Sequence, residues 1–151
     1  MNLAKLFFHA LLQKDRELKR KLEELDTVHA ALYSIGGVDY AKDRVDGGVP
    51  RDMADKMSRL MQIQAEADAQ QDAVIAMRDT AESIIKLLPD QQQRSLLWER
   101  YILGFTWERV ASNIHQSLRW VHRLEVRAFR ELNNSHEEIL KEATSSHLRP
   151  L

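Results

Sequence analysis

The chain of 151 residues has no cysteine, only five glycines and three prolines, and no long apolar run. The absence of cysteine excludes a disulfide framework, a Cys-ligated zinc site and a thiol nucleophile, and it suits a reducing cytosol. So few glycines and prolines argue against a turn-rich β protein. No apolar stretch approaches the roughly 20 residues of a membrane span, and the N-terminal stretch lacks the cleavage site of a signal peptide. We therefore expect a soluble, cytoplasmic protein with no membrane partner.

The residues that are abundant are typical of an all-α protein. Charged residues make up 30% of the chain and apolar residues 44%, and Ala, Leu, Glu, Gln, Lys and Arg dominate. The net charge of −1 is unevenly distributed. Residues 61–85 carry one Arg and five acids, whereas residues 86–132 carry eight Lys or Arg and five acids, a net charge of +3. This modest excess marks either a local binding face or an ordinary solvated surface.

The N-terminal part, residues 1–88, shows the periodicity of two long helices. Apolar residues recur at three- and four-residue steps over residues 3–33, and a near-heptad pattern covers residues 52–88. Between them, residues 34–51 contain two glycine pairs and Pro50, which predict a flexible loop. We expect residues 1–88 to form an antiparallel, coiled-coil-like helical hairpin.

The seam of this hairpin is weak in the middle of its second helix. Gln64, Ala67 and Gln71 occupy positions where a tightly packed coiled coil carries large apolar residues. The second helix either packs only on the first or also binds a second copy of the chain. We expect a homo-oligomer, with a dimer as the favoured form.

Start and stop signals divide the following segment into two short helices. Asp90 can cap a helix over residues 91–103, and Gly104 is a suitable residue to end it. Thr106 can cap the next helix, over residues 107–114. The sequence therefore predicts a short second helix directly after a glycine turn.

The remaining chain is predicted to contain one longer helix and one short one. Ser117 can cap a helix that ends at about Leu132, before two asparagines. Ser135 fits the first position of a capping box for a short helix to about Ala143. Residues 133–151 are thus predicted to be a short helix followed by a frayed tail.

The two helices on either side of residues 115–116 have the pattern of a helix-turn-helix. A short helix and a longer one are joined by a tight turn, and Ala111 lies where only a small side chain fits. The longer helix presents a basic and aromatic face opposite its core stripe. This face carries Arg119, Trp120, His122, Arg123, Arg127 and Arg130. Because the second helix of such a motif enters the major groove by its N-terminal turns, we predict that this face binds double-stranded DNA.

The cationic residues have different predicted roles. Arg119 and Arg123 are placed to reach base edges, where Arg pairs bidentately with guanine. His122 can donate to a base or to a phosphate. Phosphate contacts are predicted for Arg109, Arg127 and Arg130. Each arginine, taken alone, is better explained as part of a solvated helix surface, and only its place in the helix-turn-helix pattern favours DNA contact.

Three further residues belong to the predicted site. Trp120 either stacks on a sugar or thymine methyl group or packs against another helix, and the pattern favours neither. Thr106 is a helix cap first and a phosphate contact second. Ser117 caps the second helix and is also assigned to the DNA-binding set.

The segment LPDQQQRSLLWERYILGFTWERVASNIHQSLRWVHRLEVRAFREL, residues 88–132, resembles region four of bacterial sigma factors. It shares the family's Leu-Pro pair, the Arg-Tyr pair, a following Gly and a Thr-Trp-Glu-x-Val-Ala string. The whole chain resembles the ArpU/RinA-like late-gene transcriptional regulators of phages. Their recognition helix often carries the Val-His-Arg-Leu string found here at residues 121–124, and LEELDTVHAALYSIGG resembles their N-terminal helix and Gly-rich loop.

This resemblance implies a helical hairpin followed by a sigma region-four-like helix-turn-helix domain over residues 89–132. It implies a phage or prophage protein that regulates transcription in the bacterial host cell by binding specific double-stranded DNA. One position departs from the pattern, because His115 stands in the turn where the group has Gly, four residues after Ala111. We expect His115 to adopt a left-handed conformation, at some cost in stability.

Other functional classes have less support in the sequence. It contains no P-loop, GxSxG or HExxH string, its six histidines are scattered, and the acids of residues 34–51 lack the alternation of a calcium loop. We expect no enzyme activity, no cofactor and no metal. Two alternatives stay open: a protein-interaction module that docks on RNA polymerase or another phage protein, and a small-terminase-like DNA-packaging protein.

Overall fold

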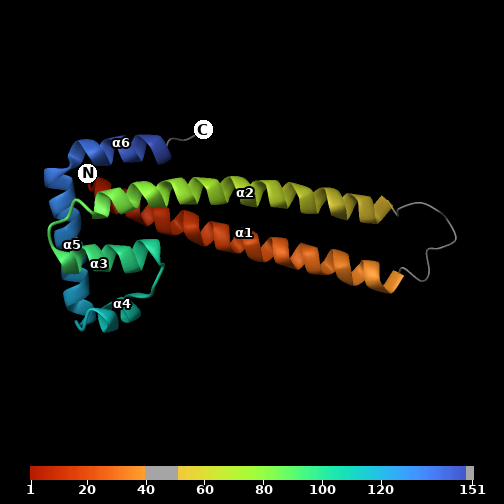
Figure 1. Ribbon diagram of the computed structural model, residues 1–151, viewed down its shortest axis with the longest axis horizontal. Coiled ribbons are helices and arrows are strands. Elements are labelled where there is room, and N and C mark those ends of the chain that lie inside the picture. The colour runs from red at the N-terminus through yellow and green to blue at the C-terminus, as the bar shows by residue number, and fades with distance from the viewer. Residues whose placement is uncertain (40–50, 149–151) are drawn as a thin grey trace. The chain divides into compact units, whose positions relative to one another are not determined.

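A computed structural model describes residues 1–39 and 51–148. Within these ranges the chain is helical and has no strand, which confirms that the protein is all-α. The elements are α1 (Leu3–Asp39), α2 (Arg51–Ile85), α3 (Gln91–Leu97), the π-helical turn η1 (Trp98–Ile102), α4 (Trp107–Asn113), α5 (Leu118–Ser135) and α6 (Glu137–His147) (Figure 1). None of the helices in the described ranges combines the length and the apolar character needed to cross a membrane.

The chain packs as two compact units, to which both long helices contribute. Unit 1 contains Met1–Asp15 and Ala73–Leu151, and unit 2 contains Arg16–Asp72. These units differ from the predicted ranges 1–88, 89–132 and 133–151. The reason is that the first turns of α1 and the last turns of α2 supply buried residues to the core that also contains α3 to α6.

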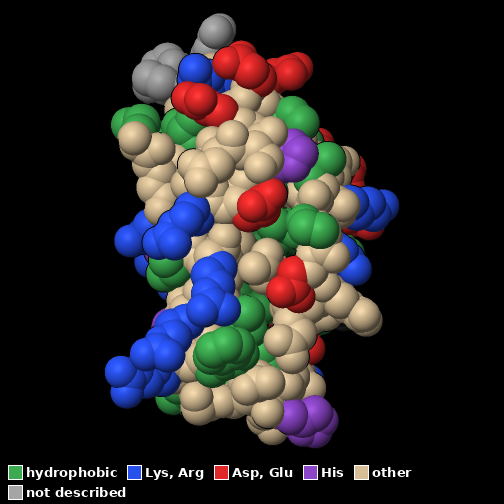
Figure 2. Space-filling view, turned by 90° about the vertical axis from the view of Figure 1, so that its left-hand side faces the viewer, with side chains coloured by type: hydrophobic (Ala, Val, Ile, Leu, Met, Phe, Trp, Pro, Cys, Tyr) green, Lys and Arg blue, Asp and Glu red, His purple; other side chains and the backbone are tan. Residues whose placement is uncertain are grey.

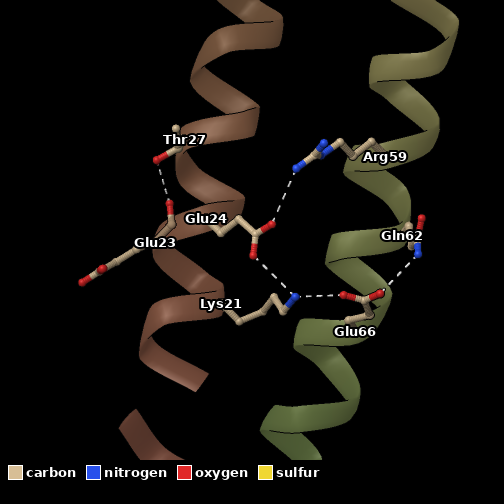
Figure 3. A network of polar contacts seen from close by, with 7 residues as sticks. All are labelled: Lys21, Glu23, Glu24, Thr27, Arg59, Gln62 and Glu66. Atoms are coloured by element: carbon tan, nitrogen blue, oxygen red, sulfur yellow. Dashed lines mark hydrogen bonds and ion pairs between the residues drawn. The ribbon is translucent and has the colours of Figure 1, made fainter. Parts of the chain in front are cut away.

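Unit 2 is a pair of antiparallel segments of α1 and α2 that lie side by side (Figure 1). Polar contacts connect the two segments (Figure 3). The ammonium group of Lys21 lies 2.9 Å from a carboxylate oxygen of Glu66, and Glu24 lies 3.9 Å from the guanidinium of Arg59. These pairs lie at the surface, where water screens the attraction between the charges, so they contribute little to stability.

The inward positions of α2 in unit 2 differ from the predicted ones. Ala67 is buried as expected, but Gln64 and Gln71 are exposed, and Ile63 is buried with 5% exposure. The side of α2 that faces α1 carries Ile63, Ala67 and the half-buried Gln70, which follow one another at steps of four and three residues. The glutamines at 64 and 71 therefore lie on the outer side of the pair, because a shift of one residue rotates a helix by about 100°.

The predicted loop over residues 34–51 is wrong at its first residues. Helix α1 continues from Tyr33 to Asp39 and passes through the glycine pair at residues 36–37. Glycine lowers helix propensity by only about 1 kcal/mol per residue and, unlike proline, keeps its backbone donor. Residues 40–50 lie outside the described part of the chain, and α2 begins at Arg51.

The ends of α2 and of the next helix also depart from the prediction in detail. Helix α2 ends at Ile85, and a turn with a bond from the N–H of Leu88 to the Ile85 carbonyl leads to the proline. The Asp90 carboxylate begins α3 as predicted and accepts two backbone N–H groups, at 2.8 and 3.4 Å. The helix expected over residues 91–103 changes into the wider π turn of η1. It stops before Gly104, whose φ of 74° carries no steric cost for glycine.

Unit 1 has an apolar core to which all of its helices contribute. Its buried side chains include Phe7, Phe8 and Leu11 of α1, Met77 and Ile84 of α2, Leu96 and Leu97 of α3, Tyr101 of η1, Val110 and Ala111 of α4, Val121, Leu124, Ala128, Phe129 and Leu132 of α5, and Leu140 of α6. The Phe8 ring centroid lies 5.4 Å from that of Tyr101 and 5.8 Å from that of Phe129. Each such buried aromatic or aliphatic side chain contributes about 1.5–3 kcal/mol.

The predicted boundary between α5 and α6 is wrong. Helix α5 does not end at Leu132 but continues to Ser135, and the Ser135 hydroxyl donates to the Glu131 carboxylate at 3.0 Å instead of capping α6. Helix α6 begins after His136 and extends to His147. Burial favours the longer α6, because Ala143 is buried and Leu148, just past the end of the helix, packs against the core of unit 1.

Asn133, which was expected to terminate α5, instead caps the start of α1. Its Oδ1 atom accepts the N–H of Ala4 at 3.0 Å, and its Nδ2 atom donates to the Asn2 side chain at 2.7 Å. Asn2 in turn accepts the N–H of Lys5 at 3.0 Å. Two otherwise unpaired donors at the helix N-terminus are thus satisfied by side chains.

Candidate nucleic-acid interface

The turn between α4 and α5 is closed by a regular set of backbone bonds. The N–H of Gln116 donates to the Ala111 carbonyl at 2.9 Å, and the N–H of His115 donates to the Ser112 carbonyl at 3.2 Å. These two bonds define a Schellman motif with His115 at the position that glycine usually holds. His115 has a φ of 57°, which confirms the expected left-handed conformation.

The helices on either side of this turn begin with hydroxyl caps, as predicted. The Thr106 hydroxyl oxygen accepts the N–H of Arg109 at 3.2 Å at the start of α4. The Ser117 hydroxyl oxygen accepts the N–H of Trp120, also at 3.2 Å, at the start of α5. Both hydroxyl residues are exposed, so each cap lies at the surface.

The outer face of α5 forms an open groove lined mainly by arginine side chains. Its lining consists of Arg119, His122, Arg123, Val126, Arg127 and Arg130. All six residues are exposed. Figure 2 shows Lys and Arg side chains gathered in a band on this side of the molecule. The structure therefore brings together five of the nine predicted site residues in one surface.

The acids of α5 are engaged away from this groove. Glu125 accepts the hydroxyl proton of Tyr101 at 2.8 Å, and Glu131 accepts the hydroxyl of Ser135 at 3.0 Å. Burial, followed by the nearby Glu125 charge, raises the pKa of Tyr101 well above its usual range, so the phenol stays a neutral donor. No acid of the described chain lines the groove, and its arginines form no ion pair with any described residue.

Three aromatic rings lie against cationic or imidazole side chains of the two helices. The Arg127 guanidinium lies 5.2 Å from the centroid of the Trp120 ring, and the His122 ring lies 4.9 Å from that of Trp107. The guanidinium of Arg109 lies 3.7 Å from the centroid of the Phe105 ring. Contacts of this kind restrict the cation and contribute about 0.5–1 kcal/mol at exposed sites.

The remaining predicted site residues lie outside the groove. Trp120 is half-buried and packs against the core of unit 1, in agreement with the packing interpretation of this residue. Thr106, Arg109 and Ser117 are exposed and do not line the groove.

Sequence reasoning missed Val126 and the contacts of Glu125. Val126 is an apolar residue that is 53% exposed among the arginines. Its spacing of three residues from Arg123 and four from Arg130 was the available signal. The Tyr101–Glu125 bond joins residues 24 positions apart and had no sequence signal.

The described residues contain no group of three or more His, Asp or Glu side chains arranged to hold a metal ion. Comparison with known proteins found no matching family model, no matching curated protein and no matching solved structure. The functional assignment therefore depends on the geometry of the α4–α5 region.

Proposed function

We propose that this protein binds specific sequences of double-stranded DNA and regulates transcription, with α4 and α5 as a helix-turn-helix and α5 as its recognition helix. The observation that carries this proposal is the outer face of α5, where four arginines and His122 are exposed together without a neutralising acid. Arginine side chains on such a face can bind the backbone phosphates that border a major groove and the edges of guanine bases inside it.

The proposed contacts follow from the position of each residue along α5. Arg119 and Arg123, on the first turns, reach base edges, and Arg127 and Arg130 lie farther along the helix, nearer to phosphates. Ser117 stands at the exposed N-terminus of α5, where backbone N–H groups favour phosphate oxygens, and the exposed Thr106 hydroxyl is a second phosphate contact. Because the net charge of the whole chain is −1, binding to random DNA should be modest.

We further propose that residues 1–88 form a helical hairpin through which two copies of the chain associate. Met57 and Met61 support this, since they are 45% and 66% exposed on α2, and an apolar partner surface would cover them. On the resemblance described above, the protein is an ArpU/RinA-like regulator of phage origin that acts in the cytoplasm of a bacterial host. Binding without catalysis is the proposed mode of action.

The test begins with selection of bound duplexes from a random pool, followed by titration of the selected duplex and a scrambled one. Arg119→Ala with Arg123→Ala should weaken binding to the selected duplex by about 5- to 150-fold per residue, since a bidentate pair contributes about 1–3 kcal/mol of discrimination. Binding to the scrambled duplex should fall only a few-fold. The matched control is Arg16→Ala with Arg20→Ala, which removes the same charge from exposed positions of unit 2.

Three results would change the assignment. Equal losses on both duplexes would restrict Arg119 and Arg123 to phosphate contacts. No duplex binding at any salt concentration would favour a protein-interaction module that docks on RNA polymerase or another phage protein. A molar mass in light scattering that corresponds to a large ring of subunits would favour a DNA-packaging protein in place of a dimeric regulator.

A further inference from the structure

The side chains of the α5 groove fall into a central stripe and two flanks. Arg119, Arg123, Val126 and Arg130 follow one another at four-, three- and four-residue steps, so they share one line along the helix. His122 and Arg127 lie about 70° to either side of this line, as the helical repeat of about 100° per residue requires. The groove therefore has a centre and two edges.

The two edge residues are the ones whose side chains rest on tryptophan rings. Arg127 lies over Trp120, and His122 packs on Trp107, whose ring also carries the guanidinium of Arg100 at 4.7 Å from its centroid. Arg119, Arg123 and Arg130 have no such ring within the described ranges. Both tryptophans are half-buried and pack against the core of unit 1, so their rings are held in place. The buried Nε1 atom of Trp120 has no hydrogen-bond partner in the described chain, so a polar contact does not account for its position.

We propose that Trp107 and Trp120 are positioning residues, which hold His122 and Arg127 at the two edges of α5 for contacts with the phosphates of opposite strands. This inference rests on the proposed DNA-binding function and adds separate roles for the edges and the central line of α5. The major groove is about 12 Å wide and is bounded by the two phosphate backbones. A helix lying in it presents its edges to the backbones and the first turns of its central line to the bases, so side chains held by a ring serve at the edges.

A ring beneath a cation lowers the entropy that the side chain loses when it binds a phosphate. The ring does not compete with the phosphate, because it occupies one face of the planar guanidinium and leaves the N–H groups at its rim available. Loss of the ring therefore weakens phosphate contacts on every sequence. The preference for particular bases, which depends on Arg119 and Arg123 of the central stripe, should not change.

The experiment is a double-mutant cycle on Trp120 and Arg127, with titrations of a selected and a scrambled duplex at several salt concentrations. Trp120→Leu should weaken binding to both duplexes by about two- to fivefold, the range that a cation–ring contact of about 0.5–1 kcal/mol supplies. Trp120→Phe, which keeps an aromatic face, should restore most of the affinity. Trp120→Leu combined with Arg127→Ala should bind no more weakly than Arg127→Ala alone, because the ring acts through that arginine.

The same cycle applies to Trp107 with His122, and Trp98→Leu is the matched control. Trp98 is also half-buried against the core of unit 1, but no cation lies over its ring among the described residues. Trp98→Leu should leave duplex affinity within about twofold of the wild type. Thermal unfolding of each variant separates a loss of fold from a loss of positioning.

The outcomes distinguish this inference from the proposed function. If the wild-type protein binds the selected duplex and the losses from Trp120→Leu and Arg127→Ala multiply, the positioning role is wrong while DNA binding stands. A change of base preference in Trp120→Leu would also overturn it. If the wild-type protein binds no duplex, the proposed function itself fails and the positioning role fails with it.

Discussion

At the residue scale, His115 shows how much of the interface depends on one backbone conformation. Its φ of 57° sets the turn between α4 and α5, and its side chain is exposed, so packing does not compensate for the strain. A β-branched residue tolerates this region far less well than His does. The direction in which α5 leaves the turn is thus fixed by a position that contacts nothing in the core.

His115→Val should lower the free energy of unfolding by about 1 kcal/mol relative to the His115 protein, since a β-branched residue is strained more than His in the left-handed region. His115→Gly should cause no loss, because glycine adopts this conformation without a Cβ clash. Urea unfolding of the three proteins measures the difference. Equal stability of the Val and Gly variants would show that the turn does not require a positive φ.

Local signals at this scale were predictable from the sequence, and non-local ones were not. The caps at Asp90, Thr106 and Ser117 each bond to backbone groups within three residues, so a short stretch of sequence contains the whole interaction. Asn133 caps a helix that begins about 130 residues earlier, and its neighbours in the sequence give no indication of this contact. A capping residue with a distant partner looks like a helix stop.

At the element scale, α6 is part of the core and not an appendage. Leu140 and Ala143 are buried at 0% and 4% exposure, and the Lys14 ammonium group donates to the carbonyl of His147 at the end of α6. The Thr80 hydroxyl lies 2.8 Å from Nε2 of the same histidine. Contacts from α1 and α2 therefore hold both the face and the C-terminus of α6.

Leu140→Ala should lower the free energy of unfolding by about 2–5 kcal/mol, the usual cost of removing a large buried side chain. The neighbouring Ile139 is 41% exposed, so Ile139→Ala should change stability by no more than about 0.5 kcal/mol. Thermal or urea unfolding of the two variants provides the comparison. Similar effects at both positions would contradict the assignment of α6 to the core.

Periodicity predicted the existence of both long helices, but the positions along them were harder to assign. In α2 the pattern over residues 52–88 contains small and polar residues on several sides, so it did not distinguish Ile63 from Gln64 as the inward residue. In α5 the apolar and basic residues are sharply separated, and Val121, Leu124 and Ala128, on the side opposite the basic face, are all buried. The clearer the amphipathic pattern, the better the face is predicted.

At the scale of the whole molecule, the sequence order hides how the core of unit 1 is assembled. Phe7 and Phe8 from the start of the chain pack against Tyr101 and Phe129. Contacts between such distant segments depend on tertiary packing, which periodicity and capping signals do not describe. The predicted range 89–132 includes the groove but lacks a large part of the core beneath it.

A peptide of residues 89–132 should therefore show no cooperative thermal transition, whereas the full chain should unfold cooperatively. The peptide lacks the buried residues of α1, α2 and α6, and its helices are too short to be stable alone. Circular dichroism during heating measures both. A peptide that melts cooperatively near the temperature of the full chain would show that the helix-turn-helix segment folds by itself.

The central claim is that the outer face of α5 binds duplex DNA, and an NMR titration of the isotope-labelled full chain with a selected duplex tests it most directly. We predict that the largest shift changes fall on the α4–α5 turn and on Arg119, Arg123 and Arg127, and that they weaken as salt is raised. Changes confined to residues of unit 2, or none at saturating duplex, would contradict the claim.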